Sequence, residues 1–168
     1  TVERPPYHAA VLAAAAVFGG YLLTLAPSVT FWDAGEFITA ARTLGIPHPP
    51  GTPLFVLIAH VWGLLFAVGE YAWRLNLLSA VCGAAAAGCW FLVAHATAST
   101  MYREIGEEPR RALALGVGAA AALLTAFSFT NWQNSAETEV YSIAMLSIGA
   151  GAERQALDIE RESETARL

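Results

Sequence analysis

Charged residues are unevenly spaced along this chain, and four long stretches contain no Asp, Glu, Lys or Arg. These stretches are residues 5–32, 43–69, 75–102 and 112–136. A helix that crosses a bilayer needs about 20 mainly apolar residues. The pattern therefore predicts an all-α, polytopic membrane protein whose helices occupy the uncharged stretches.

Three of the four stretches are long enough to cross the bilayer in full. The apolar residues predict spans at 9–25, 75–98 and 112–129. In the first span, Ala15 and Gly19 form a small-residue face suited to close helix approach. The remaining stretch is weaker, because the proline-rich residues 47–53 leave only 54–69 to form a helix of about 24 Å, shorter than a bilayer core of about 30 Å. We expect that helix to lie in the interface or to re-enter the membrane.

The arginines favour this three-span arrangement, because cytoplasmic loops carry an excess of Arg and Lys. With three spans and a cytoplasmic N-terminus, the loops near the spans hold two arginines outside and four inside: Arg4, Arg103, Arg110 and Arg111. The arginines after residue 150 lie more than about 20 residues past the last span and are not counted. With four spans in the same orientation the bias is inverted, although a four-span protein of opposite orientation would satisfy the rule. We prefer three spans, with residues 26–74 forming one long outer segment.

Composition supports the membrane class and argues against nucleic acid as a partner. Hydrophobic residues make up 56% of the 168 residues and charged residues 14%, compared with about a quarter charged in ordinary soluble domains. The net charge is −5, with nine arginines and no lysine, so no basic face is available to bind a phosphate backbone. The expected partners are the lipid bilayer and other membrane polypeptides.

In the preferred topology, acidic and amide side chains collect at the outer membrane face. They come from the outer segment and from the end of the third span: Asp33, Glu36, Glu70, Asn131, Gln133, Asn134, Glu137 and Glu139. Residues 31–41 predict a helix that carries Asp33 and Glu36 on one face, one turn apart. Two interpretations stay open. These are solvated carboxylates of an interfacial helix, or a pair in which one member is the general base for a membrane-dissolved substrate.

We expect no metal site from the sequence. His48 is followed by Pro49 and Pro50 and is interpreted as a rigid loop residue. No HxxxH, HxxE or CxxC spacing, which would be typical of a metal site, occurs in the chain.

Three segments together resemble a known family of membrane proteins. They are WDAGEFITAARTLGIPHPPGTPLFVLIAH (32–60), AWRLNLLSAVCGA (72–84) and AFSFTNWQNSAETEVYSIAML (126–146). In order and spacing they are similar to the start of a family of polytopic proteins, formerly a domain of unknown function, that includes transmembrane protein O-mannosyltransferases of the GT-C class. The resemblance covers about residues 20–148.

The resemblance implies a glycosyltransferase that takes a sugar from a polyprenyl-phosphate donor and gives it to an acceptor hydroxyl at the outer face. It implies Asp33 as the catalytic carboxylate, with Glu36 as the second candidate. It also implies that five residues bind substrate: His48, Arg74, Glu137, Glu139 and Tyr141. Of these, Arg74 would contact the donor phosphate. Apart from that donor, no cofactor is implied.

The C-terminal part departs from the family pattern of many further spans. Residues 140–152 are uncharged but too short to span, and 153–168 interleave Arg with Glu. We therefore expect a membrane bundle at 1–152, a charged, water-exposed tail at 153–168, and no transferase activity from this short chain alone. The alternative is a non-catalytic scaffold subunit of a larger respiratory or photosynthetic membrane complex. In either case we expect an integral membrane protein of a bacterial inner membrane.

Overall fold

The computed structural model describes residues 4–50, 52–108 and 110–165. Every regular element in these ranges is an α-helix. The helices are α1 (Tyr7–Thr24), α2 (Ala34–Thr43), α3 (Pro53–Leu65), α4 (Tyr71–Glu104), α5 (Arg111–Ala126), α6 (Phe129–Ala136) and α7 (Tyr141–Thr165). The predicted all-α fold class is confirmed.

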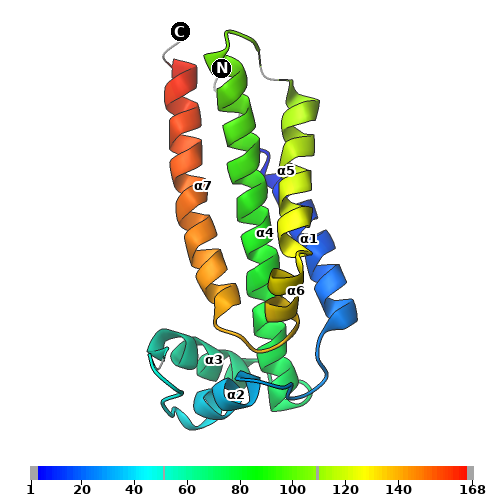
Figure 1. Cartoon of the computed structure of the whole chain (residues 1–168), viewed down its shortest axis with the longest axis vertical. Coiled ribbons are helices and arrows are strands. Elements are labelled where there is room, and N and C mark those ends of the chain that lie inside the picture. The colour runs from blue at the N-terminus through cyan, green and yellow to red at the C-terminus, as the bar shows by residue number, and fades with distance from the viewer. Residues whose placement is uncertain (1–3, 51, 109, 166–168) are drawn as a thin grey trace.

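Helix α4 forms the axis of a bundle, and α1, α5 and α7 pack along it (Figure 1). Small residues let these helices approach closely, as expected where lipid provides no hydrophobic drive between helices. Gly88 of α4 lies against Ala10 and Ala14 of α1. A Cβ atom on Gly118 of α5 would lie only 2.9 Å from the carbonyl oxygen of Phe91. The glycines on these contact faces therefore set the spacing of the bundle.

Two helices of the described residues are long and apolar enough to cross a membrane by themselves, α1 and α4. A third span exists if α5 and α6 are counted together. Helix α3 has only 13 residues, so it stays too short to span, as the sequence indicated. The prediction of a helical membrane protein is confirmed, with two spans or up to three.

The third predicted span is not one straight helix. It breaks after Ala126, and α6 leaves the direction of α5 by 67°. Polar side chains stabilise this break, because Ser128 Oγ and Asn131 Nδ2 both donate to the Thr125 carbonyl, which a helix end leaves unpaired. An uncharged stretch alone does not reveal such a break.

Helix α7 continues without interruption through the boundary expected between residues 152 and 153. Its later turns are mostly exposed, but Leu157 is buried, and Glu160 forms an ion pair with Arg103 of α4 at 3.5 Å. The described part of the charged segment, residues 153–165, is therefore helical and packs along α4, whereas a distinct tail at 153–168 stays a prediction.

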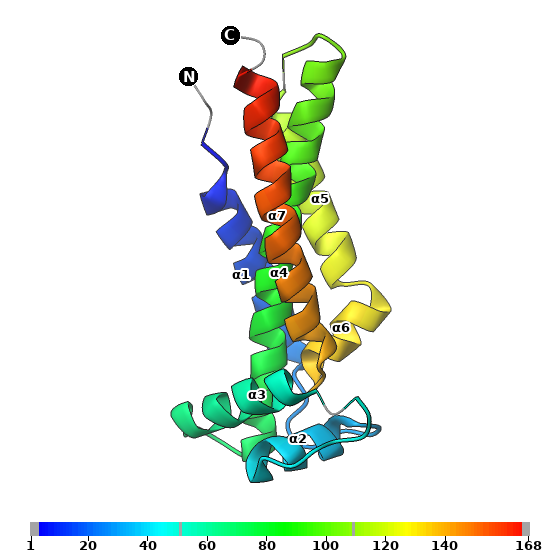
Figure 2. The same cartoon turned by 90° about the vertical axis from the view of Figure 1, so that its left-hand side faces the viewer.

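Helices α2 and α3 lie across one end of the bundle (Figure 2). The α6 helix belongs to the same half of the molecule, whereas the turn between α4 and α5 lies at the opposite end (Figure 1). This arrangement brings the outer segment and the end of α6 together, as the three-span topology requires. Which end faces the cytoplasm stays a prediction.

The small-residue face expected on the first helix does not pack within the described chain. Ala15 and Gly19 are exposed, and an added Cβ on Gly19 would meet no atom within 4 Å. Helix α1 instead packs through other positions, with Val17 and Tyr21 almost fully buried. The face of α1 that carries Ala15 and Gly19 is thus not covered by other described residues.

Candidate functional site

Helix α2 turns its apolar side inward and its carboxylates outward. Phe37, Ala40 and Ala41 are buried in one cluster with Phe55 and Val56 of α3. Because the charged residues lie on the other side of this amphipathic helix, Asp33 and Glu36 remain exposed. Packing of α2 on α3 thus fixes the position of the helix from which the two carboxylates project.

Asp33 lies at the N-cap position of α2, which begins at Ala34 and not at residue 31 as the sequence predicted. Its carboxylate makes no capping hydrogen bond to the helix. The preceding Trp32 has a left-handed backbone with φ of 64°, which costs a residue with a Cβ atom roughly 1–2 kcal/mol. Strain of this kind persists where the surrounding structure enforces it, often at functional sites. Asp33 therefore follows a strained turn and keeps its carboxylate free of the helix backbone.

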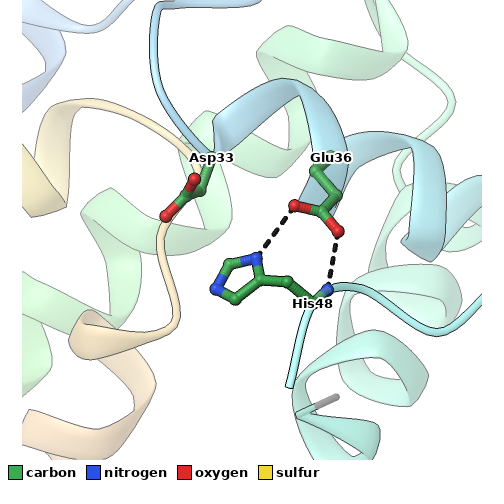
Figure 3. Close-up of side chains that lie close together, drawn as sticks. All are labelled: Asp33, Glu36 and His48. Carbon is green, nitrogen blue, oxygen red and sulfur yellow. Dashed lines mark hydrogen bonds and ion pairs between the residues drawn. The ribbon is translucent and has the colours of Figure 1, made fainter. Parts of the chain in front are cut away.

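Glu36 holds His48 through two hydrogen bonds. The His48 backbone N–H donates to Glu36 Oε1 at 2.6 Å, and Nδ1 lies 2.9 Å from Oε2. The imidazole also packs on Phe37, with ring centroids 5.6 Å apart. Figure 3 shows the ring between Asp33 and Glu36, with Nδ1 turned toward Glu36. The proline-rich loop is thus fastened to α2, and the second ring nitrogen is left available.

The same contact shifts the pKa of both partners. The hydrogen bond from the His48 side chain, followed by that from its backbone, lowers the pKa of the Glu36 carboxyl. In return, the hydrogen bond to Glu36 raises the pKa of His48 above its usual value. The pair therefore favours a charged carboxylate beside the ring.

The loop between α6 and α7 reaches the site through two buried polar residues of α4. Asn76 is fully buried, accepts a hydrogen bond from Thr138 Oγ1 at 2.6 Å, and donates to the Ala26 and Ser28 carbonyls at 2.8 and 3.0 Å. Ser79 Oγ accepts the Glu139 backbone N–H at 3.2 Å. Helix α4 therefore ties the chain that enters α2 to the loop that carries Glu139.

Glu139 is buried close to the exposed cluster. Only 8% of its surface is exposed. Burial raises the pKa of its carboxyl to about 7, helped by repulsion from Glu137 and Asp33. His48 acts on it in the opposite direction, so these groups share one electrostatic environment. The structure thus brings Asp33, Glu36 and His48 together, with Glu139 in electrostatic range of Asp33 and His48.

We expect Glu139 to make the protein less stable as the pH rises from about 5 to 8. Its folded-state pKa of about 7 exceeds the usual 4.5, so the folded state binds the proton more tightly than the unfolded state. The free energy of unfolding therefore decreases as the pH rises from the lower of these pKa values to the higher, and the loss of stability is complete above both. Glu139→Gln should remove this loss, which we expect to be about 1–2 kcal/mol.

Thermal unfolding in detergent with EDTA, at pH 5 and pH 8, measures this effect. Glu70→Gln, at the exposed N-cap of α4, is the matched control and should keep the wild-type pH dependence. An identical pH dependence in wild type and Glu139→Gln would show that Glu139 does not cause it.

The other predicted substrate-binding residues lie in different settings. All the hydrogen bonds of the Arg74 guanidinium go to carbonyls of α3 and the turn before α4, those of Gly63, Val68 and Gly69. Glu137 accepts a hydrogen bond from Gln133 at 3.2 Å. Tyr141 is 58% exposed and borders a cavity of about 20 Å³ beside Trp90, room for one water. In this structure Arg74 is a helix-turn anchor, and its predicted role toward a donor phosphate is untested.

The residues that hold the site together were not predicted from the sequence. Asn76, Ser79 and Thr138 carry no charge, and the first two lie in an apolar stretch that was interpreted as a plain span. A lone amide inside a membrane helix is costly unless it is paired. That cost was the signal in the sequence that could have identified Asn76.

Residues 33–154 match the family model described as the protein O-mannosyl-transferase TMEM260 N-terminal domain. Mouse protein O-mannosyl-transferase TMEM260 is 39% identical over 152 residues, which are 90% of this chain and 19% of the mouse protein. The Dictyostelium discoideum protein of the same name is 35% identical over 68 residues, which are 39% of this chain and 8% of that protein. The chain thus spans about a fifth of the mouse relative, and no solved structure matches it.

Proposed function

Because the chain belongs to the family of TMEM260 N-terminal domains, we propose that it is the N-terminal part of a membrane O-mannosyltransferase that uses a polyprenyl-phosphate mannose donor. The acceptor is a hydroxyl group at the membrane face on which α2 and α3 lie. GT-C architecture is part of this proposal. The observation that carries it is the position of Asp33, a carboxylate without a helix-capping bond, beside His48 at one end of an apolar bundle.

Asp33 acts as the general base in this proposal. The acceptor O–H bond breaks as its oxygen attacks the anomeric carbon of mannose, and the proton passes to the Asp33 carboxylate. The bond between that carbon and the phosphate oxygen breaks, and the polyprenyl phosphate leaves with the electron pair. Glu36 is the second carboxylate candidate, but its bond to His48 makes it less available as a base. His48, Glu137, Glu139 and Tyr141 contribute to the substrate cleft.

Apolar surface beside the site supports a lipid-linked donor. A groove of about 400 Å³ lined by Leu44, Ile46 and Val56, among others, adjoins the hollow that contains Glu36, since both include Gly45 and Ile46. The neighbouring face of α3 is also apolar, with Leu64 and Leu65 largely exposed. A polyprenyl chain suits such a groove, whereas a free nucleotide sugar gains little from it.

The open face of α1 supports a further part of the proposal, namely that this bundle packs against additional membrane helices. Ala15 and Gly19 offer a close-packing surface, and Gly116 of α5 likewise has no neighbour within 4 Å of an added Cβ. The bacterial inner membrane stays an untested expectation, and the matched relatives come from a mouse and a slime mould. Absence of activity from the chain alone also stays a prediction.

Transfer of labelled mannose by membranes that contain the natural full-length protein tests the proposed function. We expect incorporation into acceptor protein from polyprenyl-phosphate mannose and none from GDP-mannose when synthesis of the lipid-linked donor is blocked. Membranes without the protein are the control. Equal transfer from GDP-mannose under that block would contradict the lipid-linked donor. No transfer from either donor, with the protein folded in the membrane, would contradict the transferase function.

A further inference from the structure

We propose that Asp33 and His48 bind a divalent cation of the Mn²⁺ type, with Glu36 holding the imidazole in the binding orientation. This site goes beyond the transfer reaction proposed above, and its test does not depend on that reaction. It differs from the absence of a metal expected from the sequence. That expectation rested on short spacings, whereas Glu36 and His48 are 12 residues apart and meet only through the fold.

The geometry of the three side chains fits a cation. Asp33, Glu36 and His48 each offer one ligand atom, and these atoms lie within 4.8 Å of one another. Ligand atoms around one divalent cation at about 2.1–2.3 Å lie roughly 3–4.5 Å apart, so small side-chain movements close the site. Among the described residues, no other group of His, Cys, Asp and Glu has this spacing.

The orientation of His48 leaves a ligand atom free. Nδ1 forms a hydrogen bond with Glu36, and Nε2 lies on the edge of the ring that is turned away from Glu36 in Figure 3. Metal-binding histidines usually bond a carboxylate through the nitrogen that does not bind the metal, which fixes the ring. In the proposed site Glu36 takes that role, and Nε2 and the Asp33 carboxylate are the direct ligands.

Glu139 adds a further carboxyl group in electrostatic range of this place. It is more than nine-tenths buried, and no described residue forms an ion pair with its carboxylate. It interacts electrostatically with Asp33 and His48 from a different element. Its carboxyl has a pKa of about 7 and accepts a hydrogen bond from the Val140 backbone, so a bound cation nearby would favour its ionised form.

The arginines of this end are already engaged. Arg74 donates to backbone carbonyls of α3 and the following turn, and the Arg42 guanidinium lies 4.9 Å above the ring of Tyr71. Acidic groups therefore outnumber the cations around Asp33. A bound dication would balance them and would offer open positions to phosphate or hydroxyl oxygens. The mixed carboxylate and imidazole set favours Mn²⁺ over Mg²⁺, which prefers oxygen ligands.

Electron paramagnetic resonance of the full chain in detergent, titrated with Mn²⁺, tests the site. We expect one bound Mn²⁺ per chain and an electron–nuclear coupling to imidazole nitrogen. Asp33→Asn and His48→Gln should each weaken binding at least tenfold. His8→Gln changes an exposed histidine in the first turn of α1. The N-terminal end of that helix points away from α2 and α3 (Figure 2), so this variant is the matched control, with unchanged affinity expected.

Two results would overturn the site. The first is that the wild-type chain binds no stoichiometric Mn²⁺ at millimolar concentrations. The second is that Asp33→Asn or His48→Gln binds Mn²⁺ as tightly as the wild-type chain. If either variant fails to fold, the nitrogen coupling of wild-type chain with ¹⁵N-labelled histidine decides. A coupling that changes with the label supports the site, and bound Mn²⁺ without histidine coupling contradicts it. Because binding is measured directly, a failed transfer assay would leave this outcome unaffected.

Discussion

Replacement of Asp33 by Asn is expected to lower mannose transfer by about 10²–10⁴-fold, the usual contribution of a positioned general base. Asparagine keeps the shape of the side chain but cannot accept the proton of the acceptor hydroxyl. The effect should appear in kcat, with a smaller change in KM for the donor, because the lost interaction exists mainly in the transition state. Initial rates with the natural full-length protein in membranes measure it.

Glu70→Gln provides the control for this experiment, because it removes one carboxylate at the same end of the bundle without altering the cluster. Its rate should equal that of wild type. Asp33→Asn with wild-type kcat would remove Asp33 from the mechanism. Parallel measurement of Mn²⁺ affinity separates a lost base from a lost cation ligand, since added Mn²⁺ should rescue only the second defect.

Asn76→Leu is expected to lower the free energy of unfolding by about 3 kcal/mol. Asn76 is fully buried and makes three hydrogen bonds, two to backbone carbonyls and one from Thr138. Leucine has a similar volume but leaves all three partners unpaired, and each unpaired buried group costs about 1–3 kcal/mol. Transfer should fall as well, because the loop with Glu139 loses its attachment to α4. Denaturant-induced unfolding in detergent measures the stability.

Two other variants make this result specific. Thr138→Val removes only the hydrogen bond to Asn76 Oδ1, so it should cost about 1–2 kcal/mol. Thr97→Val alters an exposed threonine of the same helix that bonds only within α4 and should change little. If Asn76→Leu is no less stable than Thr97→Val, the buried amide does not hold the site together.

The spans were predictable because charge is excluded from lipid. Long uncharged stretches placed α1 and α5 within three residues of their observed bounds and α4 within six, and the proline-rich segment correctly limited α3. The bend before α6 was not predictable in this way, since it arises from hydrogen bonds of Ser128 and Asn131 to one carbonyl. Local polar bonding of this kind leaves hydropathy almost unchanged.

The site was only partly accessible from the sequence. Asp33 and Glu36 share one helix, so helical periodicity placed them on one face. Their contact with His48 depends on how the α2–α3 loop folds back, which no short spacing reveals. The role of Arg74 toward a donor phosphate was implied by the family resemblance and stays a prediction. In the structure its guanidinium donates to carbonyls of α3 and of the turn before α4.

The central claim is that the donor binds at the end of the bundle formed by α2, α3 and the α6–α7 loop. Photo-crosslinking with a polyprenyl-phosphate mannose analogue, followed by mass spectrometry of the natural full-length protein, tests it most directly. We predict labelling within residues 31–58 and 137–141 that excess unlabelled donor prevents. Donor-protected labelling only at the opposite end, in the groove of about 550 Å³ lined by Ala94, Met101 and Tyr102, would contradict the claim.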